Sequence, residues 1–200
     1  MPILYLLAGP NGTGKTTFYS IAVESGFIDK NLPFINVDTI AQTLGGYSEE
    51  NYIKASEIYR AAVGEYIQSD SDFMIESNLA DSRSYEWLSL MKKRGYKLVL
   101  YYISTDDVLI NIGRVERRLA EGGHNIPEAI IRTRYSQSHS YLKTKLFEFN
   151  EVYLIDNSTD TSLVQVKLRE GIIVHKISEL QDWIKNIISH VERFHKRKTM

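Results

Sequence analysis

The sequence predicts an α/β fold, a three-layer domain in which helices cover both faces of a mainly parallel sheet. Short apolar segments of strand character alternate with segments of helical periodicity along most of the chain. A glycine-rich loop lies between the first strand and the first helix, as a βα unit requires. Since no repeat, linker or change of composition divides the chain, we expect residues 1–200 to form one domain.

Strands are expected where short apolar runs carry branched and aromatic side chains. These runs are residues 3–8, 34–37, 73–75, 97–103 and 152–155, and a hairpin of residues 164–168 and 171–175. The run 97–103 gives the strongest strand signal. Acidic residues close the second and third strands, at Asp38 and Glu76.

Helices are expected where apolar residues recur at helical spacing and capping residues mark the ends. These segments are residues 15–25, 48–67, 84–94, 105–120, 128–150 and 178–195. Ser48 and the two glutamates after it form a capping pattern, and Gly26 and Gly95 end the first and third helices. A break at Gly122-Gly123 separates the fourth helix from the fifth.

Composition argues against several classes of protein. The formal net charge of -1 gives no electrostatic basis for binding nucleic acid or a membrane surface. The chain has no cysteine, which leaves no disulfide framework, thiolate nucleophile or cysteine-based metal site. The first apolar run ends at Gly9, too early for a membrane span. We therefore expect a soluble cytoplasmic enzyme.

The loop Gly9-Pro10-Asn11-Gly12-Thr13-Gly14-Lys15-Thr16-Thr17 matches the pattern G-x-x-x-x-G-K-[ST] and is called the P-loop below. Its glycines allow successive backbone amides to face a phosphate group. Lys15 adds a charge for the β- and γ-phosphates, and the Thr16 hydroxyl is placed to bind Mg²⁺. All nine residues are predicted to bind ATP, with Mg²⁺ as the metal.

The acids at the strand ends are candidates for the chemistry, because ligands bind at the carboxyl ends of strands in open α/β sheets. Asp38 or Glu76 could take a proton from an acceptor hydroxyl or hold Mg²⁺ through water. Alternatively, Asp38 caps the following helix and Glu76 is a solvated strand end. The strong strand 97–103 ends without the aspartate of a motor-type ATPase, which disfavours that class.

Three arginines follow in the helices on either side of the glycine break. Arg114 and Arg118 are four residues apart and share a helix face. Arg134 lies beside the apolar stripe of the next helix, where a phosphate group is a suitable partner for it. The segment of about residues 114–135 is therefore predicted to be a lid over the transferring phosphoryl group, unless these arginines form a solvated helix face.

Several motifs resemble one known family, the bacterial zeta toxins and their relatives among P-loop kinases. They are the P-loop, Asn36-Val37-Asp38, residues 73–76, Arg114-Val115 with Arg118, Gly122-Gly123-His124-Asn125-Ile126-Pro127, Ile131 with Arg134-Tyr135, and Asp156-Asn157-Ser158. They come in the order found in the family and span about four-fifths of the chain. The resemblance implies an ATP-dependent kinase with an adenylate-kinase-like core and a helical lid. Family members phosphorylate a sugar hydroxyl of UDP-N-acetylglucosamine.

The resemblance also implies roles for single residues. Lys15 and Thr16 would hold phosphate and Mg²⁺, and Asp38 would be the base. Arg118 and Arg134 would stabilise charge on the transferring group. The residues expected to contact the acceptor are Glu76, Asn78 and Arg114. The family commonly has Thr-Thr after the strand-end glutamate, and this chain has Ser77-Asn78.

Three alternatives remain open from the sequence. The chain could be a kinase of another small metabolite or a dinucleotide, without a toxic role. It could instead be a nucleotide-dependent binding switch that hydrolyses ATP slowly. It could also be a toxin whose partner is an antitoxin protein that covers the ATP site.

Overall fold

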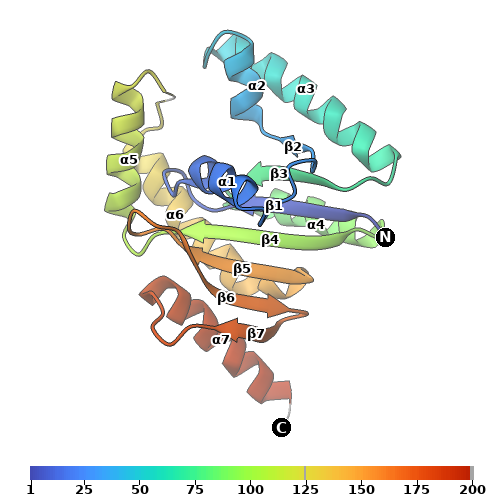
Figure 1. Cartoon of the computed structure of the whole chain (residues 1–200), viewed down its shortest axis with the longest axis vertical. Coiled ribbons are helices and arrows are strands. Elements are labelled where there is room, and N and C mark those ends of the chain that lie inside the picture. Colours follow the sequence, from blue (N-terminus) through green and yellow to red (C-terminus); the bar gives the residue numbers. More distant parts are fainter. Residues whose placement is uncertain (124, 199–200) are drawn as a thin grey trace.

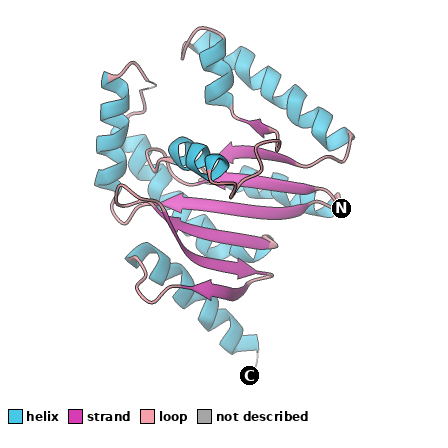
Figure 2. Ribbon diagram, viewed as in Figure 1, coloured by secondary structure: helices cyan, strands magenta, loops and turns pink. Residues whose placement is uncertain are grey.

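The structure, a computed structural model, describes residues 1–123 and 125–198 and contains a seven-stranded sheet with helices around it (Figure 1, Figure 2). The strands are β1 (Ile3–Ala8), β2 (Phe34–Ile35), β3 (Phe73–Ser77), β4 (Lys97–Ser104), β5 (Glu151–Asp156), β6 (Leu163–Arg169) and β7 (Ile172–Lys176). The helices are α1 (Lys15–Glu24), α2 (Val37–Thr43), α3 (Glu49–Gln68), α4 (Ser82–Lys93), α5 (Val108–Ala120), α6 (Glu128–Lys145), the 3₁₀ turn η1 (Leu146–Glu148) and α7 (Asp182–Lys198).

The sheet has the strand order β2-β3-β1-β4-β5-β6-β7. The first five strands in this order are parallel, and β6 and β7 are antiparallel to their neighbours. The predicted α/β fold with a mainly parallel sheet is therefore confirmed. β1 lies between β3 and β4, so the loop after β1 leaves the sheet where the strand order reverses, a position that favours ligand binding.

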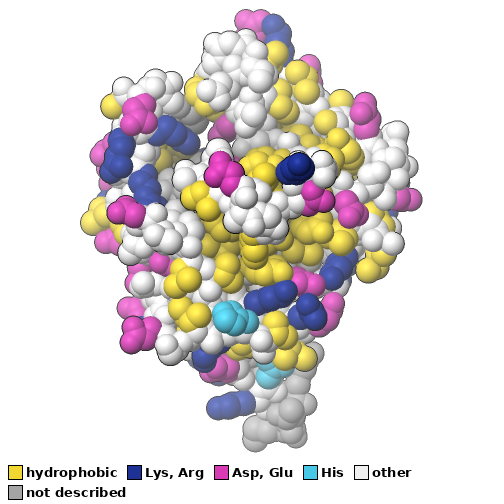
Figure 3. Space-filling view, in the orientation of Figure 1, with side chains coloured by type: hydrophobic (Ala, Val, Ile, Leu, Met, Phe, Trp, Pro, Cys, Tyr) yellow, Lys and Arg dark blue, Asp and Glu magenta, His cyan; other side chains and the backbone are white. Residues whose placement is uncertain are grey.

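Two apolar cores cover the two faces of the sheet. The larger one packs the sheet against α4, α6 and α7, and includes the fully buried Phe73, Tyr85 and Tyr102. The smaller one packs the other face against α1 alone. After β5 the chain enters a hairpin and not a helix, so part of this face has no helix over it and shows apolar side chains (Figure 3). Tyr5 and Tyr153 belong to this core and are half-buried.

The second predicted strand is too long. β2 ends at Ile35, because the side-chain oxygen of Asn36 accepts hydrogen bonds from the backbone N–H groups of Asp38 (2.7 Å) and Thr39 (3.3 Å). Asn36 is thus the N-cap of α2, a helix that the sequence indicated only as the alternative in which Asp38 is the cap. Asp38 lies in the first turn of this helix, so both expectations for it, strand end and helix cap, are wrong.

Other helix ends differ by a few residues. α5 begins at Val108, three residues later than predicted, because the Asp107 carboxylate caps it by accepting from the N–H of Leu109. The predicted helix 128–150 ends at Lys145 and continues only as η1, and α7 begins at Asp182. None of the helices that the structure describes combines the length and the apolar character needed to span a lipid bilayer.

Candidate active site

The P-loop connects β1 to α1 at the carboxyl edge of the parallel strands (Figure 1). A Cβ atom at Gly9 would overlap the carbonyl oxygen of Ile103, and one at Gly12 would overlap the backbone of Asn111. These two glycines are therefore required because the neighbouring chain segments approach so closely. Thr13 is buried, and its hydroxyl donates to the Pro10 carbonyl at 3.0 Å, which closes the turn.

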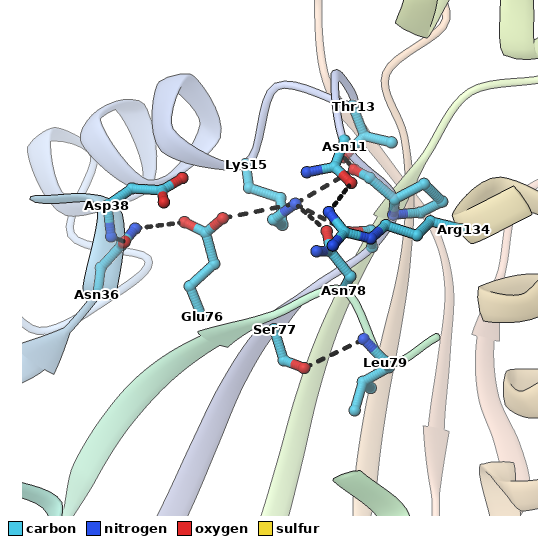
Figure 4. Close-up of polar contacts among 12 residues, drawn as sticks. Asn11, Thr13, Lys15, Asn36, Asp38, Glu76, Ser77, Asn78, Leu79 and Arg134 are labelled. Carbon is cyan, nitrogen blue, oxygen red and sulfur yellow. Dashed lines mark hydrogen bonds and ion pairs between the residues drawn. The ribbon is translucent and has the colours of Figure 1, made fainter. Parts of the chain in front are cut away.

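Lys15 lies at the centre of the site and is 6% exposed (Figure 4). Its ammonium group donates to the carbonyl oxygens of Gly9 at 2.8 Å and Pro10 at 3.2 Å. It also lies 3.4 Å from Oδ1 of Asn78 and 3.5 Å from the carboxylate of Glu76. A buried ammonium group needs such acceptors, and phosphate oxygens could replace them.

The two predicted acids lie on the same side of Lys15 (Figure 4). The second carboxylate oxygen of Glu76 accepts from the side-chain amide of Asn36 at 2.6 Å, so Glu76 joins the cap of α2 to Lys15. Asp38 follows this cap, and its Oδ1 accepts from the hydroxyl of Tyr52 on α3 at 3.0 Å. The pKa of Tyr52 is raised, mainly by burial and to a smaller extent by the nearby Asp38 carboxylate. Its hydroxyl therefore stays protonated and donates to Asp38.

Arg134, from the segment predicted to be a lid, contacts the P-loop. Its guanidinium donates to the side-chain oxygen of Asn11 at 3.0 Å (Figure 4). Arg132, two residues earlier, points to solvent and pairs with Glu128 on the exposed side of α6. Arg132 therefore lies on a solvated helix face, and Arg134 does not.

The other two predicted arginines lie on α5. Arg118 lines the same cavity as the P-loop, and the close packing of Gly123 against it leaves no room for a Cβ atom there. Arg114 also lines that cavity, but its guanidinium donates to the carbonyls of Asn157 at 2.8 Å and Thr159 at 3.2 Å. In the structure Arg114 thus holds the loop after β5, and its predicted contact with an acceptor stays a prediction.

A cavity of about 410 Å³ connects these parts and is called the nucleotide cavity below. It extends from the P-loop and the start of α1 to the loop after β5, with α5 along one side. Its lining includes Thr16, Thr17, Asp38, Glu76, Arg117 and Asp160. Asp38 therefore faces the same space as Lys15, and Arg114, Arg117 and Arg118 of α5 lie on its border.

The side chains around the nucleotide cavity fit ATP with Mg²⁺. Thr16, Asp38 and Glu76 offer hydroxyl and carboxylate oxygens, which suit Mg²⁺ when phosphate oxygens and water complete its shell. Among residues 1–123 and 125–198, no group of three or more His, Cys, Asp and Glu side chains could hold a metal ion.

Sequence reasoning gave no role to four residues that hold this site together, although two of them, Asn36 and Asn157, lie in the motifs quoted above. They are Asn36, Tyr52, Asn111 and Asn157. Asn36 could have been found from the preference for Asn at helix N-caps. Asn111 donates to the Asn11 carbonyl at 2.7 Å and Asn157 to the Thr13 carbonyl at 2.7 Å, contacts between positions 100 and 144 residues apart that no local pattern reveals. His124, part of the glycine motif, lies outside the described residues.

The chain is similar to known proteins in sequence. The family model described as Zeta toxin matches residues 1–169. A protein of Haemophilus influenzae, described as uncharacterized, is 29% identical over 130 residues, which cover 64% of this chain and 88% of that protein.

Solved structures show the same fold at lower identity. A chain of the AvrRxo1-ORF1:AvrRxo1-ORF2 complex with sulphate ions matches with a TM-score of 0.68 and 16% identity, over 94% of this chain and 64% of that chain. The same complex with ATP gives a TM-score of 0.67 at 15% identity, over 96% and 64% of the two chains. This chain thus spans about 64% of the length of that neighbour. The PezAT toxin-antitoxin system of Streptococcus pneumoniae matches with a TM-score of 0.56 and 19% identity, over 98% of this chain and 87% of that chain.

Proposed function

We propose, since the chain belongs to the zeta toxin family of P-loop kinases, that it transfers the γ-phosphoryl group of ATP to a hydroxyl group of a small-molecule acceptor. The observation that carries this proposal is the nucleotide cavity, which Lys15, Asp38 and Arg118 line together. A phosphate-binding loop, a carboxylate and guanidinium groups around one space are the groups that phosphoryl transfer requires.

In the proposed mechanism, the P-loop amides and Lys15 hold the phosphates. Lys15 exchanges the carbonyls of Gly9 and Pro10 for phosphate oxygens. Asp38 takes the proton of the acceptor hydroxyl, whose oxygen forms the new bond to phosphorus while the bond to the ADP oxygen breaks. Tyr52 keeps the Asp38 carboxylate oriented during this step.

The remaining groups compensate charge. Arg118 and Arg134 would approach the transferring phosphoryl group when the lid of about residues 114–135 closes. Thr16 would bind Mg²⁺, which supplies charge neutralisation between the β- and γ-phosphates. Glu76 and Asn78, which contact Lys15, link its position to the arrival of the acceptor.

The acceptor and the biological setting belong to the same proposal. A UDP-N-acetyl sugar is the acceptor that family membership favours, and another small metabolite or a dinucleotide is the alternative. The neighbour from Streptococcus pneumoniae is described as a toxin-antitoxin system, so an antitoxin protein is a proposed partner of this chain. We further propose that residues 1–200 act as one kinase domain in the cytoplasm.

The test is mass spectrometry of a cell extract incubated with enzyme and ATP, searching for a metabolite that gains one phosphate. Lys15→Ala and Asp38→Asn are compared with the native chain. Asp182→Asn is the matched control, because this carboxylate is 78% exposed on α7 and pairs only with a neighbour on its own helix.

The native chain and the control are expected to form the same product. Asp38→Asn should bind ATP normally and transfer about 10²–10⁴-fold more slowly, the usual contribution of a general base. Full transfer by Asp38→Asn would show that the base is another residue. Tight ATP binding without a phosphorylated product in any extract would favour the binding switch.

A further inference from the structure

A second cavity, of about 470 Å³, lies between α3 and α4 above strands β1 and β3 and is called the α3–α4 cavity. Its floor is apolar and includes Leu6, Val63, Ile67, Ile75, Leu79 and Leu88. Two aromatic side chains, Tyr59 from α3 and Trp87 from α4, also line it, and both are only partly buried. A flat ring could therefore enter this space and pack against them.

Glu76 connects this cavity to the reaction, because it lines both the α3–α4 cavity and the nucleotide cavity. The same carboxylate lies 3.5 Å from the Lys15 ammonium group. The α3–α4 cavity and the nucleotide cavity are therefore adjacent at the Glu76 side chain.

Two arginines line the α3–α4 cavity. Arg60 from α3 and Arg83 from α4 line it, and both side chains are exposed. Within the described part of the chain, neither guanidinium forms an ion pair or a hydrogen bond. Asp81 also lines the cavity, but its carboxylate caps α4 by accepting from the N–H (3.0 Å) and hydroxyl (3.1 Å) groups of Ser84.

This arrangement discriminates between classes of acceptor. A sugar ring in the cavity would place hydroxyl groups against apolar side chains. Each polar group that is buried without a hydrogen-bond partner weakens the free energy of binding by about 1–3 kcal/mol. A flat apolar ring has no hydrogen bonds to lose on entering the cavity, and it can pack against Trp87 and Tyr59. Guanidinium groups bind phosphate and carboxylate with paired hydrogen bonds, so Arg60 and Arg83 suit an anionic substituent on that ring.

We propose that the α3–α4 cavity binds the acceptor and selects a molecule that joins a flat apolar ring to an anionic group. Trp87 packs against the ring, and Arg60 and Arg83 pair with the anion. The acceptor hydroxyl then extends past Glu76 toward Asp38. This inference rests on the proposed kinase function, and it names three side chains that determine acceptor specificity.

The binding test uses the native chain, with the nucleotide cavity filled by a non-hydrolysable ATP analogue, so that no transfer occurs. The probes are phenyl phosphate and 4-hydroxybenzoate, which join a flat apolar ring to a phosphate and to a carboxylate group. The comparison probes are uridine, N-acetylglucosamine 1-phosphate and inorganic phosphate, each of which lacks one feature. Tryptophan fluorescence reports binding, and Trp87→Phe identifies which of the two tryptophans responds.

At least one ring–anion probe is expected to bind about tenfold more tightly than every comparison probe. Arg60→Gln and Arg83→Gln should each weaken that probe about tenfold and leave uridine unchanged. Arg193→Gln, an exposed arginine on α7, is the matched control and should change nothing. If N-acetylglucosamine 1-phosphate binds as tightly as the ring–anion probes, or both arginine variants bind them normally, the proposal is wrong.

The two proposals fail in different ways. A kinase whose acceptor binds elsewhere would phosphorylate a metabolite in extract while the ring–anion probes show no response. If the protein binds these probes through Arg60 and Arg83 but forms no product, the α3–α4 cavity is a binding site and the proposed kinase function is wrong.

Discussion

Asn157 joins the P-loop to the loop after β5, and its replacement by alanine tests how firmly the two are joined. Asn157 is 8% exposed, its amide donates to the Thr13 carbonyl at 2.7 Å, and its oxygen accepts from the Ser162 hydroxyl at 2.7 Å. Asn157→Ala leaves the Thr13 carbonyl without this partner. Because an unpaired buried acceptor costs about 1–3 kcal/mol, we expect the free energy of unfolding to fall by that amount.

Gly14 makes this test sharper. The residue has a φ of +84°, and a Cβ atom on it would overlap the side-chain amide of Asn157. Gly14→Ala therefore introduces left-handed strain of about 1–2 kcal/mol and a steric overlap. In the Asn157→Ala background only the strain remains. A double-mutant cycle should thus give a coupling of at least about 1 kcal/mol.

The control is Gly26→Ala, because Gly26 has a φ of +74° and nothing lies within 4 Å of its Cβ position. This change should add to Asn157→Ala within about 0.5 kcal/mol. Urea unfolding followed by circular dichroism gives the free energies, and calorimetry with ATP shows whether the P-loop keeps its shape. If the effects of Gly14→Ala and Asn157→Ala on the free energy of unfolding add as closely as those of Gly26→Ala and Asn157→Ala, the contact between Gly14 and Asn157 does not constrain the P-loop. The reasoning is then refuted.

Three further changes probe the site. Tyr52→Phe removes the donor to Asp38 and should lower kcat about tenfold, the effect of one hydrogen bond to a charged group, with KM for ATP unchanged in a coupled assay. Arg134→Gln should slow transfer about 10³-fold, as loss of a charge-stabilising arginine does, whereas Arg132→Gln should match the native rate. Burial lowers the pKa of His139 to about 4 from 6.5, so the folded chain keeps it neutral while the unfolded chain takes up a proton. Stability should therefore fall by up to about 3 kcal/mol as pH drops from 6.5 to 4, and His139→Phe should remove this part of the pH dependence in urea titrations.

Local pattern was sufficient for the phosphate-binding part of the site. The spacing of glycine, lysine and threonine predicts a loop in which the backbone amides themselves face the phosphate groups. The position of Lys15 in the site could therefore be predicted from this spacing alone. Arg134 could also be placed, because an arginine beside the apolar stripe of α6 had to face the interior. Its partner in the structure, the side chain of Asn11, was not foreseen.

Tertiary contacts decided the rest. Asp38 lines the nucleotide cavity from a helix and not from a strand end, since the Asn36 side chain starts a helix where the apolar run 34–37 suggested a strand. Asn157 reaches the P-loop only because β5 lies beside β4 in the folded sheet. The α3–α4 cavity was not predicted at all, because α3 and α4 each contribute one arginine and one aromatic ring without a sequence motif.

The shortness of β2 has a consequence for selectivity. Only two residues pair with β3, and a single residue, Asn36, separates them from α2. Asp38 on α2 and the residues Tyr59 and Arg60 on α3 therefore lie on one pair of packed helices at the edge of the sheet (Figure 1). We expect this pair to move as one body, so that a molecule that fits the proposed acceptor site poorly would also hold the Asp38 carboxylate away from its hydroxyl. Poor acceptors are then discriminated by slow turnover as well as by weak affinity.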